Sequence, residues 1–454
     1  MSPQADVQGN PALRSNCPRR PRVLRLSRHH STRDDMRFRC CFTLLLATAT
    51  LACREAAQPA VDPDLARAIA GIKAIDNHAH PVRPTAPGVP VDSEFDALPV
   101  DSLEPQSDPV GQRGASPAVV EAHKRLFGTS DKAAALKEHG DNYATWLLDQ
   151  MGIETMISNR VVMGPGLPSS RFLWVPFADA LMYPLGTKQL IHSPDQNEFY
   201  PLEDKLLNRY YAESGVNGKP ATLSDYLEKV VRATLERHKA GGALAEKYEM
   251  AYLRTLAVGN PSRAEAERAF AGNGDYTALQ DYIFRYIAIE CGRLGMAVHI
   301  HVAHGGGGYF NVNWANPLLL EPLLNDPTLR KTNFVMIHGG WPWTREITPL
   351  LTKPNAYLDF SEQLNFDSPH NVAEALRGWL VYNPEKVLFA TDAYPFSKDL
   401  GWEEAGLVAT DAARNALGRA LTAMMRDGEI SRERAVELAT MVMRDNAKKL
   451  YGLK

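Results

Sequence analysis

The stretch AIDNHAH at residues 74–80 ends in two histidines, His78 and His80, separated by a single residue. Its first residues form an apolar, strand-like run, and alternate residues of a strand point to the same face. His78 and His80 can therefore aim at one point just beyond the strand end, as two imidazole ligands of a divalent ion must. Taken alone, the pair is weak evidence, because histidines in loops are often merely solvated.

Three further apolar runs end in a metal-type ligand: MAVHIH at 296–301, NFVMIH at 333–338 and KVLFATD at 386–392. Buried parallel strands read as such continuous apolar runs. In a (β/α)8 barrel the active-site residues lie at the C-terminal ends of the strands. A strand in a core has no need of a terminal imidazole, so we predict a metal site formed by His78, His80, His301, His338 and Asp392.

Eight strand-like segments alternate with helical stretches, at residues 73–78, 153–158, 171–177, 243–248, 296–301, 333–338, 356–360 and 386–392. This alternation favours an α/β fold with a parallel sheet, here a (β/α)8 TIM barrel. The two longest insertions, at 81–140 and 179–222, follow the first and third strands. Both leave a C-terminal strand end, so we expect them to cover the active site; exposed surface loops are the alternative.

The sequence resembles the amidohydrolase superfamily of metal-dependent (β/α)8 barrels over about residues 63–454. A closer likeness, to the amidohydrolase-related group that includes decarboxylases and the hydrolase-like domain of some glutamine synthetases, lies in the motifs VHIH at 298–301, IHGGWP at 337–342, FATDA at 389–393 and DNA at 445–447. The superfamily pattern, His-x-His on strand 1, His on strands 5 and 6 and Asp on strand 8, falls on the five ligands named above.

The resemblance also implies a role for Lys247, because binuclear members often carry a carbamylated lysine on strand 4 that bridges two ions. A free amine at this position could instead bind a substrate carboxylate, and an ordinary surface lysine is the third interpretation. We expect one divalent ion, or two if Lys247 is carbamylated. The imidazole and carboxylate ligands favour Zn²⁺.

These features predict an amidohydrolase-type, metal-dependent hydrolase. The ion would lower the pKa of its bound water toward about 7. Asp392 would accept a proton as hydroxide attacks an amide, lactone or ester of a small molecule. His338 would either bind a second ion or donate a hydrogen bond that polarises the substrate. Two alternatives remain at this stage: a metal-dependent decarboxylase of a small carboxylic acid, and a non-catalytic exported barrel protein.

Three residues are candidates for substrate binding: Lys247, Arg345 and Tyr309, the last two because they follow ligand-bearing strands. An arginine positioned to hold a carboxylate would favour the decarboxylase. His299 shares strand parity with His301 but lies farther from the strand end, so we interpret it as a supporting or core imidazole.

The composition of the 454 residues, with 44% hydrophobic residues and a formal net charge of −3, is that of an ordinary globular protein without a nucleic-acid footprint. Residues 1–35 are Arg- and Pro-rich and suggest an over-extended start or a disordered leader, and residues 54–454 form the predicted barrel domain. Cys291 is expected to be a small buried hydrophobe. The oligomeric state stays open.

Residues 36–53 read as a secretory signal peptide, with a basic start at Met36 and an apolar run up to Cys53. The apolar run is too short to span a bilayer. The ending LAC at 51–53 is similar to a lipoprotein box, although Thr50 stands where an aliphatic residue is usual. We therefore predict an exported protein, either periplasmic or anchored to the membrane by a lipid on Cys53.

Overall fold

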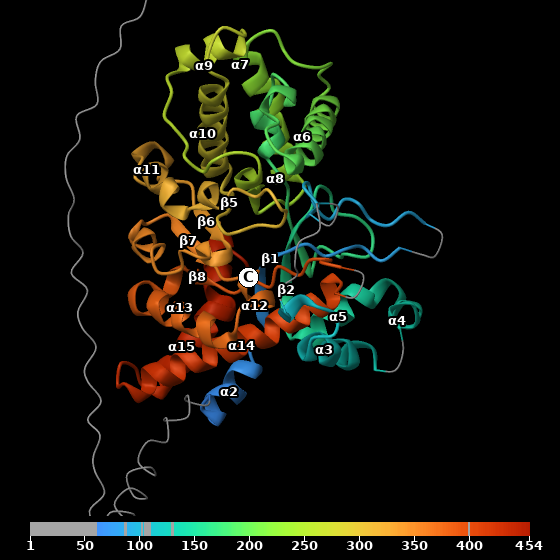
Figure 1. Ribbon diagram of the computed structural model, residues 1–454, viewed down its shortest axis with the longest axis vertical. Helices are drawn as coiled ribbons and strands as arrows, with labels where there is room; N and C mark the ends of the chain where they lie inside the picture. Colours follow the sequence, from blue (N-terminus) through green and yellow to red (C-terminus); the bar gives the residue numbers. More distant parts are fainter. Residues whose placement is uncertain (1–60, 86–88, 101–102, 104–109, 129–130, 398–399) are drawn as a thin grey trace, which may run out of the picture. The chain divides into compact units, whose positions relative to one another are not determined.

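The computed structural model describes residues 61–85, 89–100, 103, 110–128, 131–397 and 400–454 (Figure 1). The expected leader, the signal segment and Cys53 lie outside these residues. All eight expected strands are present, with small differences at their ends: β1 (Ala74–Ala79), β2 (Ile153–Asn159), β3 (Phe172–Val175), β4 (Ala245–Tyr248), β5 (Ala297–His301), β6 (Phe334–Ile337), β7 (Ala356–Asp359) and β8 (Val387–Leu388).

The strands pair in parallel and in sequence order, as β1-β2-β3 and as β4-β5-β6-β7-β8. Main-chain hydrogen bonds join the two groups at both edges. Between β3 and β4, the Lys247 amide donates to the Pro176 carbonyl at 2.7 Å. Between β8 and β1, the Asp392 amide donates to the His78 carbonyl at 2.9 Å. The eight strands therefore close into a barrel, which leaves no free sheet edge.

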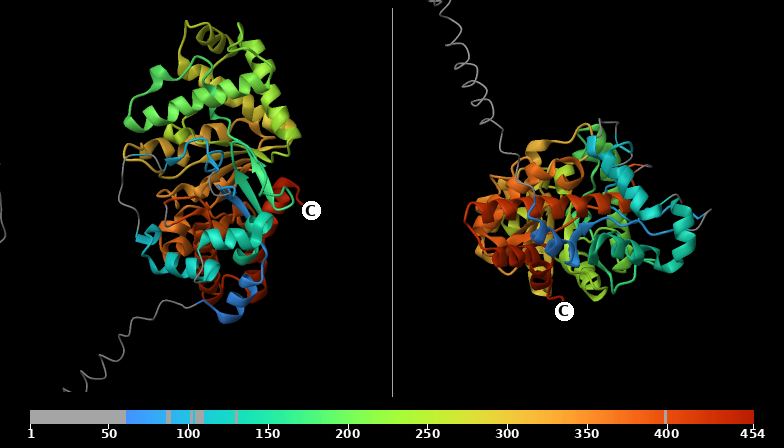
Figure 2. Two further views of the ribbon diagram at one scale, coloured as in Figure 1. Left: turned by 90° about the vertical axis from the view of Figure 1, so that its right-hand side faces the viewer. Right: turned by 90° about the horizontal axis from the view of Figure 1, so that it is seen from below.

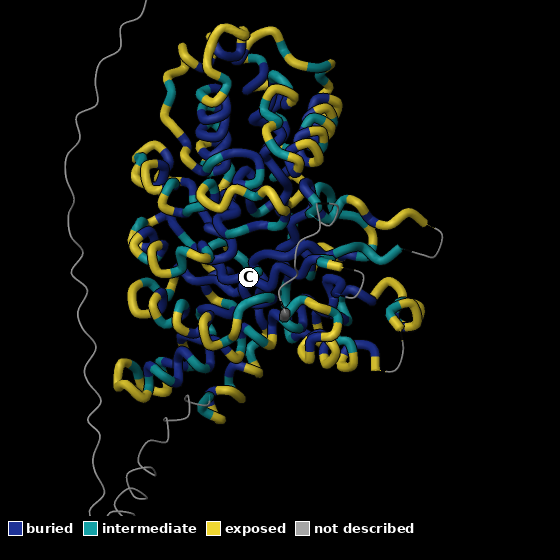
Figure 3. Tube along the Cα trace, in the orientation of Figure 1, coloured by how far each residue is buried: buried dark blue, intermediate teal, exposed yellow. Residues whose placement is uncertain are grey.

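The barrel interior is packed by small and branched side chains that alternate along the strands. Its central cluster comprises Ile75, Ile157, Val175, Ala245, Ala297, Val335, Ile337 and Leu388. A larger cluster fills the layer between the strands and the helices, and it includes the buried Cys291. Figure 3 shows this distribution, with buried chain at the centre and exposed chain on the outer turns.

The helices of the structure are α2 (Pro63–Ala70), α3 (Pro117–Phe127), α4 (Lys132–His139), α5 (Tyr143–Met151), α6 (Pro194–Glu213), α7 (Leu223–Tyr226), α8 (Ala233–Ala240), α9 (Arg263–Phe270), α10 (Tyr276–Leu294), α11 (Glu321–Leu324), α12 (Gln363–Phe366), α13 (Pro369–Tyr382), α14 (Trp402–Arg426), α15 (Arg432–Thr440) and α16 (Asn446–Tyr451). Side-chain caps begin many of them, as at Ser193 of α6 and Ser368 of α13, each followed by a proline that suits the first turn.

Two connections are long. The chain between β1 and β2 carries α3, α4 and α5, and the chain between β3 and β4 carries α6, α7 and α8. In Figures 1 and 2, α6, α7, α9 and α10 gather at one end of the molecule, with the strands near its centre. No helix in the described part of the chain is both long and apolar enough to cross a bilayer.

Candidate active site

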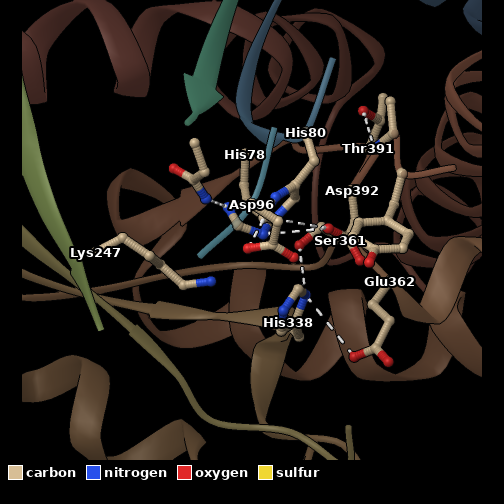
Figure 4. Close-up of polar contacts among 12 residues, drawn as sticks. His78, His80, Asp96, Lys247, His338, Ser361, Glu362, Thr391 and Asp392 are labelled. Atoms are coloured by element: carbon tan, nitrogen blue, oxygen red, sulfur yellow. Dashed lines mark hydrogen bonds and ion pairs between the residues drawn. The ribbon is translucent and has the colours of Figure 1, made fainter. Parts of the chain in front are cut away.

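The five expected ligands meet at the C-terminal end of the barrel, and Figure 4 shows four of them, His78, His80, His338 and Asp392. His78 and His80 come from β1, His301 ends β5, and His338 and Asp392 follow β6 and β8. Asp392 Oδ1 lies 3.2 Å from His78 Nε2 and 3.8 Å from His80 Nε2. The ring centroid of His338 is 5.0 Å from that of His78 and 4.6 Å from that of His301. All five side chains are buried.

The backbone bends sharply where it presents these side chains. His338, Glu362 and Asp392 are the three non-glycine residues with positive φ in the described chain, at 76°, 53° and 51°. This region is unfavourable for residues with a Cβ and persists only where the surroundings hold it. All three residues line the same cavity. The strain is therefore concentrated where the strands deliver their functional groups.

Hydrogen bonds to carbonyls fix which nitrogen of two imidazoles carries the proton. His80 Nδ1 donates to the Phe95 carbonyl at 3.1 Å, and His301 Nε2 donates to the Ala303 carbonyl at 2.9 Å. Since a carbonyl can only accept, the other ring nitrogen of each is unprotonated in the neutral ring. Such outer contacts orient an imidazole for metal binding.

Asp359, at the end of β7, organises the His338 turn. Its Oδ1 accepts hydrogen bonds from the His338 amide at 3.0 Å and from Ser361 Oγ at 2.6 Å. Because the Ser361 hydroxyl donates to Asp359, it accepts from His338 Nδ1 at 2.9 Å. His338 Nε2 is then free of a proton. Asp359 Oδ2 also accepts from Asn77, whose amide oxygen accepts from the Tyr451 hydroxyl.

The electrostatics of the centre suit a cation. Burial holds the pKa of His78, His80, His301 and His338 well below the ordinary range, so the imidazoles are neutral. Burial also raises the pKa of Asp392 to about 7, partly offset by the positive charge of Lys247.

A buried nitrogen without a partner marks the place for that cation. His78 Nε2 has no hydrogen-bond partner among the described residues, although it faces Asp392. His78, His338 and Asp392 each place one ligand atom within 4.8 Å of the others, and so do His301, His338 and Glu362. An orphaned imidazole nitrogen beside a carboxylate fits a divalent ion. The residues present therefore fit the expected metal.

A cavity of about 210 Å³ opens onto these ligands. Beside the polar residues, its lining includes aromatic and aliphatic side chains: Leu98, Val100, Tyr252, Trp341, Phe366, Tyr394 and Phe396. The β1–β2 connection contributes Leu98, Val100 and Gln112. Lys247 is buried in the cavity wall, with its Nζ 3.5 Å from Glu249 Oε1. Lys247 is the one lysine among the described lining residues, and no arginine is among them.

Two of the expected substrate-binding residues lie elsewhere. Arg345 is exposed, beyond the turn that follows Trp341, and lines a separate cavity. Tyr309 is 50% exposed, and its amide donates to Asp195 Oδ2 at 3.0 Å. Lys247 alone of the three reaches the ligand-bearing cavity. Proximity in sequence to a ligand strand was not enough to place a side chain in the site.

The position of His299 agrees with its interpretation as a supporting or core imidazole. It is buried, and its Nε2 lies 2.7 Å from the Tyr451 hydroxyl on α16. It does not line the cavity that His80, His301, His338 and Asp392 line.

Sequence reasoning missed four acidic residues: Asp96, Glu249, Glu362 and Asp359. The signal for Glu249 and Asp359 was present, since one follows β4 and the other ends β7, both at the C-terminal edge of the barrel. Asp96 lies in the β1–β2 connection, and no periodicity in the sequence identifies it.

Comparisons with known proteins agree with this architecture. The model of the family described as Amidohydrolase matches residues 231–453. Protein fluG of Emericella nidulans is 29% identical over 154 residues, which are 33% of this chain and 17% of that protein. The match thus spans about a sixth of the length of this curated relative.

Solved structures share the fold at low identity. A protein described as a metal-dependent hydrolase from Lactobacillus casei ATCC 334 aligns with a TM-score of 0.61 at 16% identity, over 86% of this chain and 97% of that one. A glucuronate isomerase from Caulobacter crescentus aligns with a TM-score of 0.54 at 16% identity, over 88% and 97%. A uronate isomerase from Thermotoga maritima gives 0.53 at 14%, over 86% and 98%. These likenesses establish the barrel fold.

Proposed function

The chain belongs to the amidohydrolase family through residues 231–453, and from that premise we propose that it is a metal-dependent hydrolase of a small amide, lactone or ester. One observation carries the proposal: His78 Nε2 is buried and unpartnered, 3.2 Å from Asp392 Oδ1, amid three more neutral imidazoles. His78, His80, His301 and Asp392 would hold the ion, and Zn²⁺ suits this ligand set.

When bound, the ion would supply a Lewis acid and a source of hydroxide near neutral pH. Asp392 accepts the proton of the attacking water and returns it to the leaving group. Neutral His338 presents an unprotonated Nε2, since its Nδ1 proton goes to Ser361. This favours a ligand over a hydrogen-bond donor to the substrate.

The cavity walls support an uncharged substrate. Beside the aromatic side chains, the described lining contains four carboxylates, on Asp96, Glu249, Glu362 and Asp392, and one lysine. Burial raises the pKa of all four carboxyl groups, so the lining carries little net charge around the substrate space. We propose that the segments after β1 and β3 cover the active site, which the contribution of Leu98 and Val100 to its wall supports for the first of them.

The decarboxylase stays the second candidate, because Lys247 is a buried cation that could hold one carboxylate. The two reactions are separated by their products: release of CO₂ from aromatic or aliphatic carboxylic acids, or cleavage of amides, lactones and esters. All five expected ligands are present beside a cavity, which argues against the third alternative, a non-catalytic barrel protein.

The proposal predicts that activity and metal are lost together. Purified protein should carry at least one divalent ion, and chelation should abolish turnover until an ion is restored. The double variant His78→Ala, His80→Ala should lose both the ion and hydrolysis. His192→Ala is the control, because His192 is exposed and lies outside the ligand group, and it should keep both. Elemental analysis with a panel of substrates checks this, and full turnover by a metal-free wild-type protein would refute it.

We further propose that the protein is exported, on the basis of the Met36–Cys53 segment. Expressed from Met36, it should be cleaved near Cys53 and recovered outside the cytoplasm. Mass spectrometry of the mature N-terminus distinguishes simple cleavage from a diacylglycerol on Cys53. An uncleaved N-terminus beginning at Met36 on cytoplasmic protein would contradict export.

A further inference from the structure

The C-terminal helix α16 packs against the end of the barrel opposite the proposed metal ligands. Its Tyr451 contacts the interior cluster that includes Ala245 and Ala297, the first residues of β4 and β5. The Tyr451 hydroxyl extends farther into the barrel, because it lies 2.6 Å from Asn77 Oδ1 and 2.7 Å from His299 Nε2. A side chain from one end of the barrel therefore reaches the layer next to the ligands at the other end.

This layer is polar, and it consists of Asn77, His299 and Asp359, all fully buried. Two residues earlier on the same strands, Ile75 and Ala297 belong to the apolar interior of the barrel. Buried polar groups cost more free energy than apolar groups of similar size, even when they are paired. Stability alone therefore does not account for a polar layer at this depth.

The hydrogen bonds on the Tyr451 side of this layer have a determined direction. The Asp359 carboxylate can only accept, so Asn77 turns its Nδ2 toward Asp359 Oδ2, at 2.9 Å, and its oxygen toward Tyr451. The Tyr451 hydroxyl must then donate to Asn77, and its oxygen accepts from His299 Nε2. Burial holds the pKa of Tyr451 well above its ordinary range, so the hydroxyl keeps the proton that it donates.

On the other side of Asp359 the hydrogen bonds end at a proposed ligand. Asp359 Oδ1 accepts from Ser361 Oγ at 2.6 Å, and Ser361 Oγ accepts from His338 Nδ1 at 2.9 Å (Figure 4). Asp359 Oδ1 also accepts from the His338 amide at 3.0 Å. Burial raises the pKa of Asp359, and these donors together with Asn77 oppose that rise and stabilise the carboxylate. Asp359 thus contacts the backbone of His338 directly and its ring through Ser361.

We propose that Tyr451 is a positioning residue of the active site, whose hydroxyl fixes Asn77 and, through Asp359, the ring of His338. Without the hydroxyl, the Asn77 oxygen loses its donor, and the carboxamide can turn that oxygen toward Asp359. Oxygens with no proton between them repel each other, so Asp359 would move and release the His338 ring. The inference rests on the proposed function only in that His338 is taken as a metal ligand.

Tyr451→Phe removes the hydroxyl and keeps the ring. A direct outer contact of a ligand is worth about 10–100-fold in metal affinity, and Tyr451 acts through intermediate residues. We therefore expect the dissociation constant of Zn²⁺ to rise by about tenfold, at the low end of that range. Tyr357→Phe is the matched control, because Tyr357 packs against the same cluster and takes no part in these hydrogen bonds. It should bind Zn²⁺ as the wild type does, which competition with a chromophoric chelator measures.

A second variant distinguishes this chain of contacts from a general packing effect. Ser361→Ala removes the link between Asp359 and the ring of His338. If Tyr451 acts through Asp359, the double variant with Tyr451→Phe should weaken Zn²⁺ binding by less than the product of the two single effects. Fully multiplicative effects would overturn the proposal, and so would an unchanged dissociation constant in Tyr451→Phe.

A measurement on the metal-free protein makes the test independent of the reaction. With ¹⁵N-labelled histidine, nuclear magnetic resonance of the wild type should show His338 protonated at Nδ1, assigned by the loss of this signal in His338→Gln. In Tyr451→Phe we expect a mixture of the two His338 tautomers. A wild type protonated at Nε2, or a variant with an unchanged signal, would contradict the positioning role. The expected signals in a protein that cleaves no substrate would support that role and refute the proposed function.

Discussion

Asp392 combines three properties that rarely occur in one residue: a left-handed backbone at φ 51°, near-complete burial, and a pKa raised to about 7. The bend turns its carboxylate back toward His78 at the strand end. Burial then makes the charged form expensive unless a cation neutralises it. A residue held in this way is suited to exchange protons beside a bound ion.

If Asp392 moves a proton as well as holding the ion, Asp392→Asn should reduce turnover far more than metal content. Asparagine keeps an oxygen ligand but cannot accept the proton of water. With the variant saturated with metal, we expect kcat to fall by about 10²–10⁴-fold. The measurement is kcat at increasing ion concentration, with wild type titrated in parallel. Recovery to the wild-type rate would show that Asp392 is only a ligand.

At this scale the positions of the proposed ligands could be predicted from sequence, because a polar residue that ends an apolar strand run has a fixed position in a barrel. His78 and Asp392 are such residues. Arg345 and Tyr309 line other cavities, because they lie several residues past a strand, where local turns decide the direction of the side chain. Asp96 was missed because its position depends on the tertiary course of a long connection.

The turn after β6 shows how an element delivers a ligand. His338 and the two glycines that follow it, Gly339 and Gly340, all have positive φ. A Cβ added at Gly339 would lie 2.8 Å from Trp379 Cη2 and 2.9 Å from Gln363 Nε2. Glycine is therefore required here for two reasons: the backbone is left-handed, and α13 packs too closely for a Cβ.

Gly339→Ala should destabilise the protein by about 2–4 kcal/mol, from left-handed strain and overpacking together. Gly378→Ala is the control, because this helical glycine on α13 has open space around its Cβ position. That change should stabilise the protein by about 0.5–1 kcal/mol. Denaturant unfolding of both variants checks the pair, and equal effects of the two would contradict this account of the turn.

At the scale of elements, the sequence was sufficient for all eight strands, since most of them are short apolar runs; β1 and β4 also carry polar and charged residues. The ends differed by a few residues, most at β8, where a run expected over 386–392 forms a strand only over Val387–Leu388. The residues after Leu388 leave the strand and place Asp392 beside His78. Tertiary contacts decide this strand end, and the alternation of apolar residues does not indicate it.

At the scale of the whole molecule, burial of Asp392 couples the stability of the metal-free fold to pH. Its pKa is 3.8 when unperturbed and about 7 in the fold, so the folded chain binds this proton more tightly. The contribution is fully present below about pH 4 and is lost as the pH rises toward 7. An asparagine side chain does not titrate, so comparison with the Asp392→Asn variant isolates the effect of this group.

We therefore expect the stability of the metal-free wild type, relative to Asp392→Asn, to fall between about pH 5 and pH 7. The slope cannot exceed about 1.4 kcal/mol per pH unit, the value for one proton. Urea unfolding of both proteins across this range measures it. Saturating metal should remove the trend in the wild type, because ligation favours the carboxylate. Parallel pH profiles without metal would contradict the prediction.

The contacts that close the barrel at β1 join residues that are far apart in the sequence. The Tyr451 hydroxyl donates to Asn77 Oδ1 across 374 residues of sequence, and the Asp392 amide donates to the His78 carbonyl. A nascent chain still emerging from the ribosome holds His78 and His80 but lacks Asp392 and the helix that supports their strand. All five proposed ligands are present only after translation of residue 392, and the contact that supports Asn77 only after residue 451.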